Sequence, residues 1–378
     1  MAENLRIGIG EYGERIAAVR GGARARALDG VVAYGAHRDY QPADLRYLAD
    51  WYCIEEETAL LFIPLEGPTE LVTDADWDLR RASIEAVADG TSYSDDLGSA
   101  LAELIGSRCE RNARIGVAGW GFFPASVYLE VRRQLPGVEI VDASQIVSDL
   151  RMIKSAGELR LMREAARISD AAMAAGIDMV TEGNTEFAVA AAAEHVIRSW
   201  SAEPSFVTEM GAGPRTAMGT FLPSSHRLAH GEVAVLDCGA RVSGYHGDMC
   251  RTVVVGRVDA RQRAMLEAVA CAVCSAIEAA KPGVTVGDVR AQAARVIAEA
   301  GFRDYLWDSL MPHGNGTGQH EPPNANDNPD LPLREGMVLC MELGLAVPDH
   351  GAFNLEQMIA VTSGHAEVLN ALPLALWE

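Results

Sequence analysis

Long apolar segments are missing from this sequence. No run approaches the roughly 18 apolar residues that a membrane-spanning helix needs. The first twenty residues, MAENLRIGIGEYGERIAAVR, lack the apolar core and cleavage site of a secretory signal peptide. Cysteine is also sparse, with seven residues at no framework spacing, which indicates reduced thiols. We therefore expect a cytoplasmic protein rather than a secreted or membrane-spanning one.

Positive charge is scarce as well. The chain has 32 Lys and Arg against 53 Asp and Glu, a net charge of −21. Nucleic acids and anionic membranes need a basic surface, so neither is expected as a partner. Residues 1–150 contain no P-loop to cradle a phosphate. The expected partner is a small molecule or a short peptide, with no organic cofactor.

A paired set of zinc-binding cysteines is also absent. Cys271 and Cys274 form a C-x-x-C inside the helical pattern of residues 263–280, but no second pair completes a zinc site. We predict that both cysteines are small core residues.

The length of 378 residues predicts two domains. Residues 1–150 alternate helical and strand patterns, which predicts an α/β domain with a mostly parallel or mixed sheet. Residues 151–378 form the second domain. Two helix–helix–strand blocks in it, residues 156–256 and 260–362, resemble each other in order, which suggests a weak internal duplication.

The stretch Glu232–Gly256, EVAVLDCGARVSGYHGDMCRTVVVG, organises the second domain. Its apolar runs, 233–236 and 252–255, flank a glycine-rich turn and predict a hairpin. Asp237 ends the first run and Asp248 precedes the second, so antiparallel pairing brings the two carboxylates together. Neighbouring carboxylates repel each other unless a cation lies between them, and oxygen ligands suit Mg, Ca or Mn. The alternative is turn chemistry, because Asp is common in turns.

Further candidate ligands follow this hairpin. His313 and His320 lie seven residues apart in a glycine-rich loop, where the bare backbone can approach a ligand. Imidazole suits Mn, Fe, Co and Zn. Glu342 and Glu356 lie in apolar strand-like runs, where a carboxylate is costly unless it is paired or bound to metal. The alternatives are a hydrogen-bonded structural histidine and glutamates on solvent-facing strands.

These motifs resemble those of the pita-bread family, which includes prolidase, aminopeptidase P, methionine aminopeptidase and creatinase. LDCG with GYHGDMCRT resembles D-x-G…Y-x-x-D-x-x-R-T, HGNGTGQHE resembles H-G-I-G-x-x-x-H-E, and EGMVLCME resembles P-G-M-V-x-x-x-E. LRYL near residue 45 and LRMIKS near residue 150 extend the likeness over nearly the whole chain. The resemblance implies an α/β N-terminal domain and an α+β C-terminal pita-bread catalytic domain.

The resemblance implies a centre of two divalent metal ions. Asp237 would chelate one ion, His313 and Glu342 would hold the other, and Asp248 and Glu356 would bridge the two. A mostly oxygen donor set favours Mn, with Co, Fe or Zn as alternatives. The family also implies a homodimer.

The resemblance also implies two catalytic residues. Glu342 would accept a proton from the water shared by the metals, and His320 would hydrogen-bond the substrate or the developing oxyanion.

Two positions depart from the peptidase pattern. Where peptidase members carry a His before the central hairpin, this chain has Thr220, with His226 and His230 further downstream. Where proline-specific members carry an Arg two residues before the last ligand, it has Asn354. We therefore expect a complete set of metal ligands and an altered substrate pocket.

The favoured function is a metallohydrolase, Xaa-Pro aminopeptidase- or dipeptidase-like, which cleaves a C–N bond of a dipeptide or a small amino-acid-like substrate. The alternatives are a lyase acting on a small carboxylate, a creatinase-like amidohydrolase and a binding or scaffolding protein. Creatinase lacks this metal set and non-catalytic relatives have lost ligands, so the five retained residues weigh against the last two.

Overall fold

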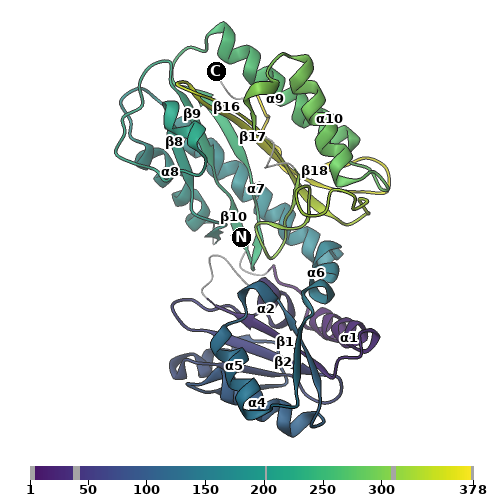
Figure 1. Cartoon of the computed structure of the whole chain (residues 1–378). Helices are drawn as coiled ribbons and strands as arrows, with labels where there is room; N and C mark the ends of the chain where they lie inside the picture. The colour runs from purple at the N-terminus through teal and green to yellow at the C-terminus, as the bar shows by residue number, and fades with distance from the viewer. Residues whose placement is uncertain (1–4, 37–42, 201, 308–311, 376–378) are drawn as a thin grey trace. The chain divides into compact units, whose positions relative to one another are not determined.

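The structure, a computed structural model, describes residues 5–36, 43–200, 202–307 and 312–375. Its contacts divide the chain into two units (Figure 1). One comprises residues 7–151, and the other begins at Met152 and includes Leu5 and Arg6. Across this described part of the chain, no helix combines the length and the apolar character needed to span a bilayer.

The N-terminal unit is a six-stranded mixed sheet with helices on both faces. Its strand order is β4-β3-β2-β1-β5-β6, with parallel pairs at β1–β5, β5–β6 and β3–β4. The elements are α1 (Ile9–Ala25), β1 (Gly30–Gly35), α2 (Ala43–Ala49), β2 (Ala59–Pro64), β3 (Glu70–Thr73), η2 (Asp76–Asp78), α3 (Leu79–Glu85), β4 (Gly90–Tyr93), α4 (Leu97–Arg108), β5 (Arg114–Ala118), η3 (Trp120–Phe122), α5 (Ala125–Gln134), β6 (Glu139–Asp142) and α6 (Ser144–Met152). The predicted α/β class is confirmed.

The two central strands explain why this sheet is covered on both faces. Every residue of β1 and β2 is buried, as expected for near-continuous apolar runs rather than alternating ones. One face packs against α1, α2 and α6, and the other against α4 and α5.

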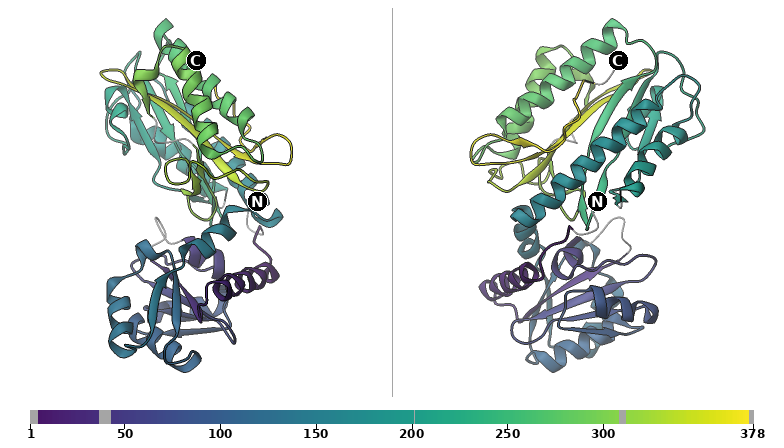
Figure 2. Two further views of the ribbon diagram at one scale, coloured as in Figure 1. Left: turned by 45° about the vertical axis from the view of Figure 1, so that its right-hand side comes forward. Right: turned by 180° about the vertical axis from the view of Figure 1, so that it is seen from behind.

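The C-terminal unit is an α+β arrangement of two helix pairs against antiparallel strands. Its elements are α7 (Ala156–Asp178), α8 (Glu186–Ser199), β7 (Glu203–Pro204), β8 (Glu209–Ala212), η4 (Gly213–Met218), β9 (Val233–Asp237), β10 (Ala240–Val242), β11 (Tyr245–His246), β12 (Cys250–Val254), α9 (Ala260–Ala279), α10 (Val286–Glu299), η5 (Arg303–Tyr305), β13 (Leu306–Trp307), β14 (His313–Gly314), β15 (Glu321–Asn324), β16 (Val338–Val347), β17 (Gly351–Ala360) and β18 (Glu367–Val368). The strands form the sheets β12-β9-β8, β11-β10-β7 and β15-β14-β16-β17-β18, and β13 also pairs with β16. Figure 2 shows each helix pair beside its own strands.

The two helix pairs repeat the same local construction one hundred residues apart. Thr185 caps α8 and Thr285 caps α10, each through its side-chain oxygen. Gly183 and Gly283, both with positive φ, each donate an N–H to a downstream leucine carbonyl. This repetition agrees with the internal duplication suggested by the sequence.

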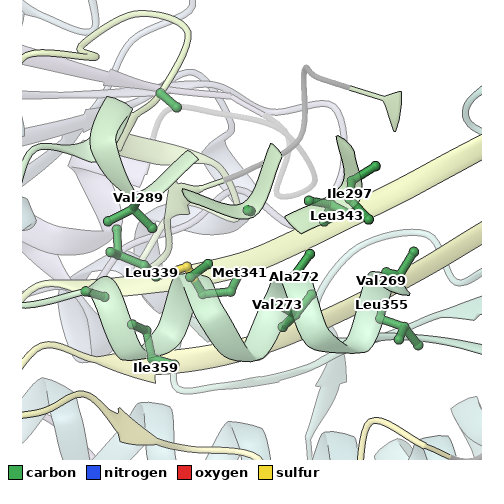
Figure 3. Packing of buried hydrophobic residues seen from close by; sticks show 14 of the residues in the cluster. Val269, Ala272, Val273, Val289, Ile297, Leu339, Met341, Leu343, Leu355 and Ile359 are labelled. Carbon is green, nitrogen blue, oxygen red and sulfur yellow. The ribbon is translucent and has the colours of Figure 1, made fainter. Parts of the chain in front are cut away.

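Apolar packing against α9 holds β16 and β17, the strands that carry Glu342 and Glu356. Val269, Ala272 and Val273 of α9 lie against Leu339, Met341 and Leu355 of β16 and β17 (Figure 3). Because these side chains occupy one face of the sheet, the residues that alternate with them point to the other face.

The structure corrects two details of the sequence interpretation. Cys271 and Cys274 are exposed on α9 rather than in the core, because the helix buries Ala272, Val273 and Ala276 instead. The glycine-rich turn of the central hairpin is not a simple loop, since β10 and β11 form a further small hairpin within it.

Candidate metal centre

The central hairpin brings the first two carboxylates to one end of a ladder. Strands β9 and β12 pair antiparallel, with Asp237 opposite Cys250. Asp248 lies two residues before Cys250, and residues two apart on an extended chain point the same way. The backbone N–H of Cys238 donates to the carbonyl of Met249 and extends the pairing. The two aspartates are therefore diagonal neighbours rather than directly opposite each other, as antiparallel pairing of the two runs was expected to place them.

Three neighbouring strands supply the other candidate ligands. Glu342 of β16 is directly opposite Glu356 of β17, and His313 of β14 pairs with Cys340 of β16. His313 Nε2 lies 3.5 Å from Glu356 Oε1 and 4.0 Å from Glu342 Oε2. One ligand atom each of Asp248, His313, Cys340 and Glu356 lies within 4.8 Å of the others.

Four of the five candidate ligands carry buried polar atoms that the protein leaves without hydrogen-bond partners. Asp237 Oδ1, Asp248 Oδ2, His313 Nε2 and both carboxylate oxygens of Glu356 have no hydrogen-bond partner. Burial raises the pKa of each of the four carboxyl groups, and their mutual repulsion raises those of Asp237, Asp248 and Glu356 further. Hard oxygen donors with one imidazole fit divalent cations, which would satisfy these atoms and cancel the repulsion.

A metal-free form of the protein should therefore lose stability as the pH rises. In the folded state these four carboxyl groups hold protons that the unfolded chain releases near pH 4. Their contribution to stability is present below about pH 4 and is lost as the pH rises through the raised values. We expect the Tm of EDTA-treated protein to be higher at pH 5.5 than at pH 8, and Mn²⁺ to remove most of the difference.

The variant Asp237→Asn separates this effect from the general acidity of the chain. Removing one carboxylate should raise the Tm of the metal-free protein at pH 8 by several degrees and flatten its pH dependence. An unchanged pH dependence in this variant would assign the effect to the surface charges.

His320 lies beside the candidate ligands. Its ring centroid is 4.2 Å from that of His313, at an interplanar angle of 53°. Burial and the neighbouring His313 lower its pKa to about 3, so the imidazole is neutral at physiological pH. A neutral ring can donate one hydrogen bond to an oxygen without adding charge to the centre.

A buried ion pair holds the loop between the two histidines. Lys154 Nζ lies 2.8 Å from Glu321 Oε1, and both side chains are almost fully buried. The backbone N–H of Gly318 donates to the other oxygen of Glu321. A side chain at Gly316 would overlap the same carboxylate. The pair thus ties the residue after His320 to the segment that precedes α7.

Sequence reasoning missed two groups at the centre. Glu209 of β8 is directly opposite Asp237, and burial followed by the charge of Glu342 raises its pKa to about 7. Cys340 lies two residues before Glu342, and its buried sulfur accepts a hydrogen bond from the Asn315 amide. Strand periodicity could have indicated Cys340, which shares a face with Glu342 on β16. Glu209 gives no such signal, because it lies beside Asp237 only through the pairing of β8 with β9.

Neither downstream histidine takes the place of the one missing at Thr220. His226 Nε2 lies 2.9 Å from Glu232 Oε2, and His230 packs beside Gly256. Both contacts are at the end of the β9–β12 ladder opposite to Asp237.

Comparison with known proteins agrees with this architecture. The model of metallopeptidase family M24 matches residues 160–363, and that of the creatinase/prolidase N-terminal domain matches residues 15–153. A Xaa-Pro dipeptidase from Pyrococcus horikoshii is 34% identical over 241 residues, which cover 64% of this chain and 68% of the relative.

Two solved structures are similar over nearly the full length. The prolidase from Pyrococcus horikoshii superposes with a TM-score of 0.84 at 26% identity, covering 95% of this chain and 99% of the other. A dipeptidase from Mycobacterium ulcerans has a TM-score of 0.84 at 27% identity, covering 98% and 99%. The two-domain pita-bread prediction is thereby confirmed. The chain is a metallohydrolase that belongs to metallopeptidase family M24 and carries a creatinase/prolidase N-terminal domain.

Proposed function

We propose that this protein uses a pair of divalent metal ions, manganese in the first instance, to hydrolyse a C–N bond in a dipeptide or a small amino-acid-like substrate. Asp237 would chelate one ion, His313 and Glu342 would hold the other, and Asp248 and Glu356 would be ligands to both. The observation that carries the proposal is the set of buried, unpartnered donor atoms on four of these five side chains. The Xaa-Pro dipeptidase and prolidase named among its relatives support the same bond type.

The side chains around the centre have distinct roles in this reaction. A bound metal pair supplies a water of lowered pKa and stabilises charge on the attacked carbonyl oxygen. Glu342 would accept a proton from the attacking water, and the Asn354 amide, which donates to Glu342 Oε1 at 2.7 Å, fixes the orientation of this carboxylate. His320, neutral at physiological pH, donates a hydrogen bond to the oxyanion.

The test is metal dependence combined with product analysis. Purified protein should lose amidase activity on a panel of dipeptides and N-acyl amines after EDTA treatment and regain it with Mn²⁺. In ¹⁸O-labelled water, a hydrolase incorporates the label into the released carboxylate. Thr220 and Asn354 depart from the residues expected in a proline-specific peptidase, and this difference keeps a lyase as the second candidate function. An unlabelled alkene product would favour the lyase. Activity that is indifferent to EDTA would exclude both.

His320→Ala should lower the rate and leave metal binding intact. Losing one hydrogen-bond donor to a developing oxyanion costs about 10²–10³ in kcat, while the five proposed ligands are untouched. His226→Ala is the matched control, because His226 lies at the far end of the ladder against Glu232. Metal content and kcat should both be normal in the control. An unchanged kcat in His320→Ala would remove this residue from the mechanism.

We also propose that the protein works as a cytoplasmic homodimer. All seven cysteines are free, which suits a reducing compartment. Light scattering after size-exclusion chromatography tests the dimer, for which the expected mass is twice 40.4 kDa.

A further inference from the structure

A fifth carboxylate lies beside the four of the metal centre. Glu209 is directly opposite Asp237 in the β8–β9 ladder, so both side chains are on the same face of the sheet. The backbone N–H of Phe221 donates to the Glu209 carboxylate, and Glu342 is the charged group that acts on it. Glu209 is half-buried, so part of its carboxylate remains open to a ligand.

Glu209 adds a negative charge beyond those that two divalent metal ions would balance. Two divalent cations carry as many positive charges as the four carboxylates of the centre carry negative ones. Burying a further carboxylate next to them is costly unless it takes up a proton or a positive group pairs with it.

Three buried or partly buried cationic side chains of the C-terminal unit are engaged elsewhere. The Arg251 guanidinium donates all five N–H groups, to the Gln357 side chain and to the backbone carbonyls of Cys250, Glu356, Leu372 and Pro373. Arg215 pairs with Glu186 and donates to the Leu222 carbonyl. Lys154 pairs with Glu321. None of these hydrogen bonds reaches Glu209.

A second acceptor, Asn354, lies on β17, two residues before Glu356 and bonded to Glu342. Asn354 donates its Nδ2 to Glu342 Oε1, which fixes the amide orientation, because the reverse orientation would set two oxygens against each other. Its Oδ1 is then a buried acceptor with no partner. The opposite residue is Gly344, where a Cβ would lie 3.2 Å from this oxygen. Glycine therefore places no side chain of its own against Oδ1.

An aromatic ring completes these surroundings. Trp307 pairs with Gly344 from the other side, so Trp307 and Asn354 flank the same glycine on the same face of the sheet. Indole faces attract cations, particularly where water is excluded. The surroundings of the centre thus offer two acceptors, one of them charged, together with an indole.

We infer that Glu209 and Asn354, hereafter the acceptor pair, bind a positively charged nitrogen group of the substrate, such as an ammonium, amidinium or guanidinium, close to the scissile C–N bond. The inference rests on the proposed hydrolase function and specifies its substrate class. A substrate with a free carboxylate at this position would meet the Glu209 carboxylate, and the neutral amide of Asn354 offers no positive charge to pair with it. The acceptor pair therefore selects against the carboxylate end of an Xaa-Pro dipeptide and in favour of a cationic one.

The test uses three probes of similar size that differ in charge: N-acetyl-1,3-diaminopropane, N-propylacetamide and N-acetyl-β-alanine. Their binding to the Mn²⁺-loaded protein is measured from paramagnetic relaxation of the probe protons, with Zn²⁺-loaded protein as the diamagnetic blank. This signal reports binding near the metal and does not require turnover. We expect the cationic probe to bind about tenfold more tightly than the neutral one and the anionic probe to bind most weakly.

Two substitutions connect the preference to the acceptor pair. Glu209→Gln keeps an acceptor for the Phe221 N–H but removes the charge, so the preference for the cationic probe should fall to within about twofold of parity. Asn354→Arg should reverse the order of the cationic and anionic probes. Glu209→Asp should retain part of the wild-type preference, and the Tm of each variant is measured to confirm folding.

The outcomes separate this inference from the proposed function. Protein that retains no Mn²⁺ by elemental analysis contradicts the metal centre itself. Mn²⁺-loaded protein that binds all three probes equally, prefers the anionic one, relaxes none of them, or keeps its preference in Glu209→Gln contradicts the role of the acceptor pair alone.

Discussion

Asp248→Ala is expected to abolish both metal retention and hydrolysis. In the proposed centre Asp248 bridges the two ions, and its carboxylate lies with His313 and Glu356 in one cluster of potential ligand atoms. Losing a group that merely orients a ligand costs 10–100-fold in metal affinity or activity, so losing a ligand common to both ions should cost at least about 10³-fold in kcat. Elemental analysis of the purified variant and its kcat on the best wild-type substrate provide the measurement.

A control and a contrary outcome make this experiment decisive. Asp304→Ala removes an exposed aspartate of η5, and its metal content and rate should match those of the wild type. If Asp248→Ala purified with two ions per chain, the bridging role of Asp248 would be wrong even with its activity lost.

The large features of this protein follow from local sequence patterns. The alternation of helices and strands before residue 150 and the hairpin around Asp237 and Asp248 need only nearby residues to be recognised. The same holds for Glu342 and Glu356, because an acidic residue inside an apolar strand is conspicuous. Their convergence on one site came from the family resemblance rather than from periodicity.

What the sequence did not predict depends on register and on the buried face of each element. Glu209 belongs to the centre only because β8 pairs with β9 so that it lies opposite Asp237, and a shift of one residue would turn it to the other face. The same reasoning applies to Cys271 and Cys274, since a helical pattern rich in alanine does not reveal which stripe packs inward. Such residues require the long-range pairing to be known.

The buried ion pair between Lys154 and Glu321 predicts the largest loss of stability. Their charged atoms are 2.8 Å apart and almost fully shielded from water, and removing one partner from a buried pair typically costs 3–5 kcal/mol, because the other charge is left uncompensated. Lys154→Met should therefore lower the Tm of the C-terminal unit by roughly 6–20 °C, at about 2–4 °C per kcal/mol. Differential scanning calorimetry measures the shift.

The cause of that loss can be isolated by removing the second charge. In Lys154→Met/Glu321→Gln no buried charge is left unpaired, so part of the lost stability should return, whereas adding two independent losses would lower the Tm further. Arg163→Met is the surface control, since its pair with Glu367 is about half exposed and is worth at most about 1 kcal/mol. Because Glu321 also accepts the Gly318 N–H and follows His320, the single variant should lose kcat in addition to stability. A double variant less stable than Lys154→Met alone would contradict the unpaired charge as the cause of the loss, because the glutamine amide oxygen can still accept the Gly318 N–H.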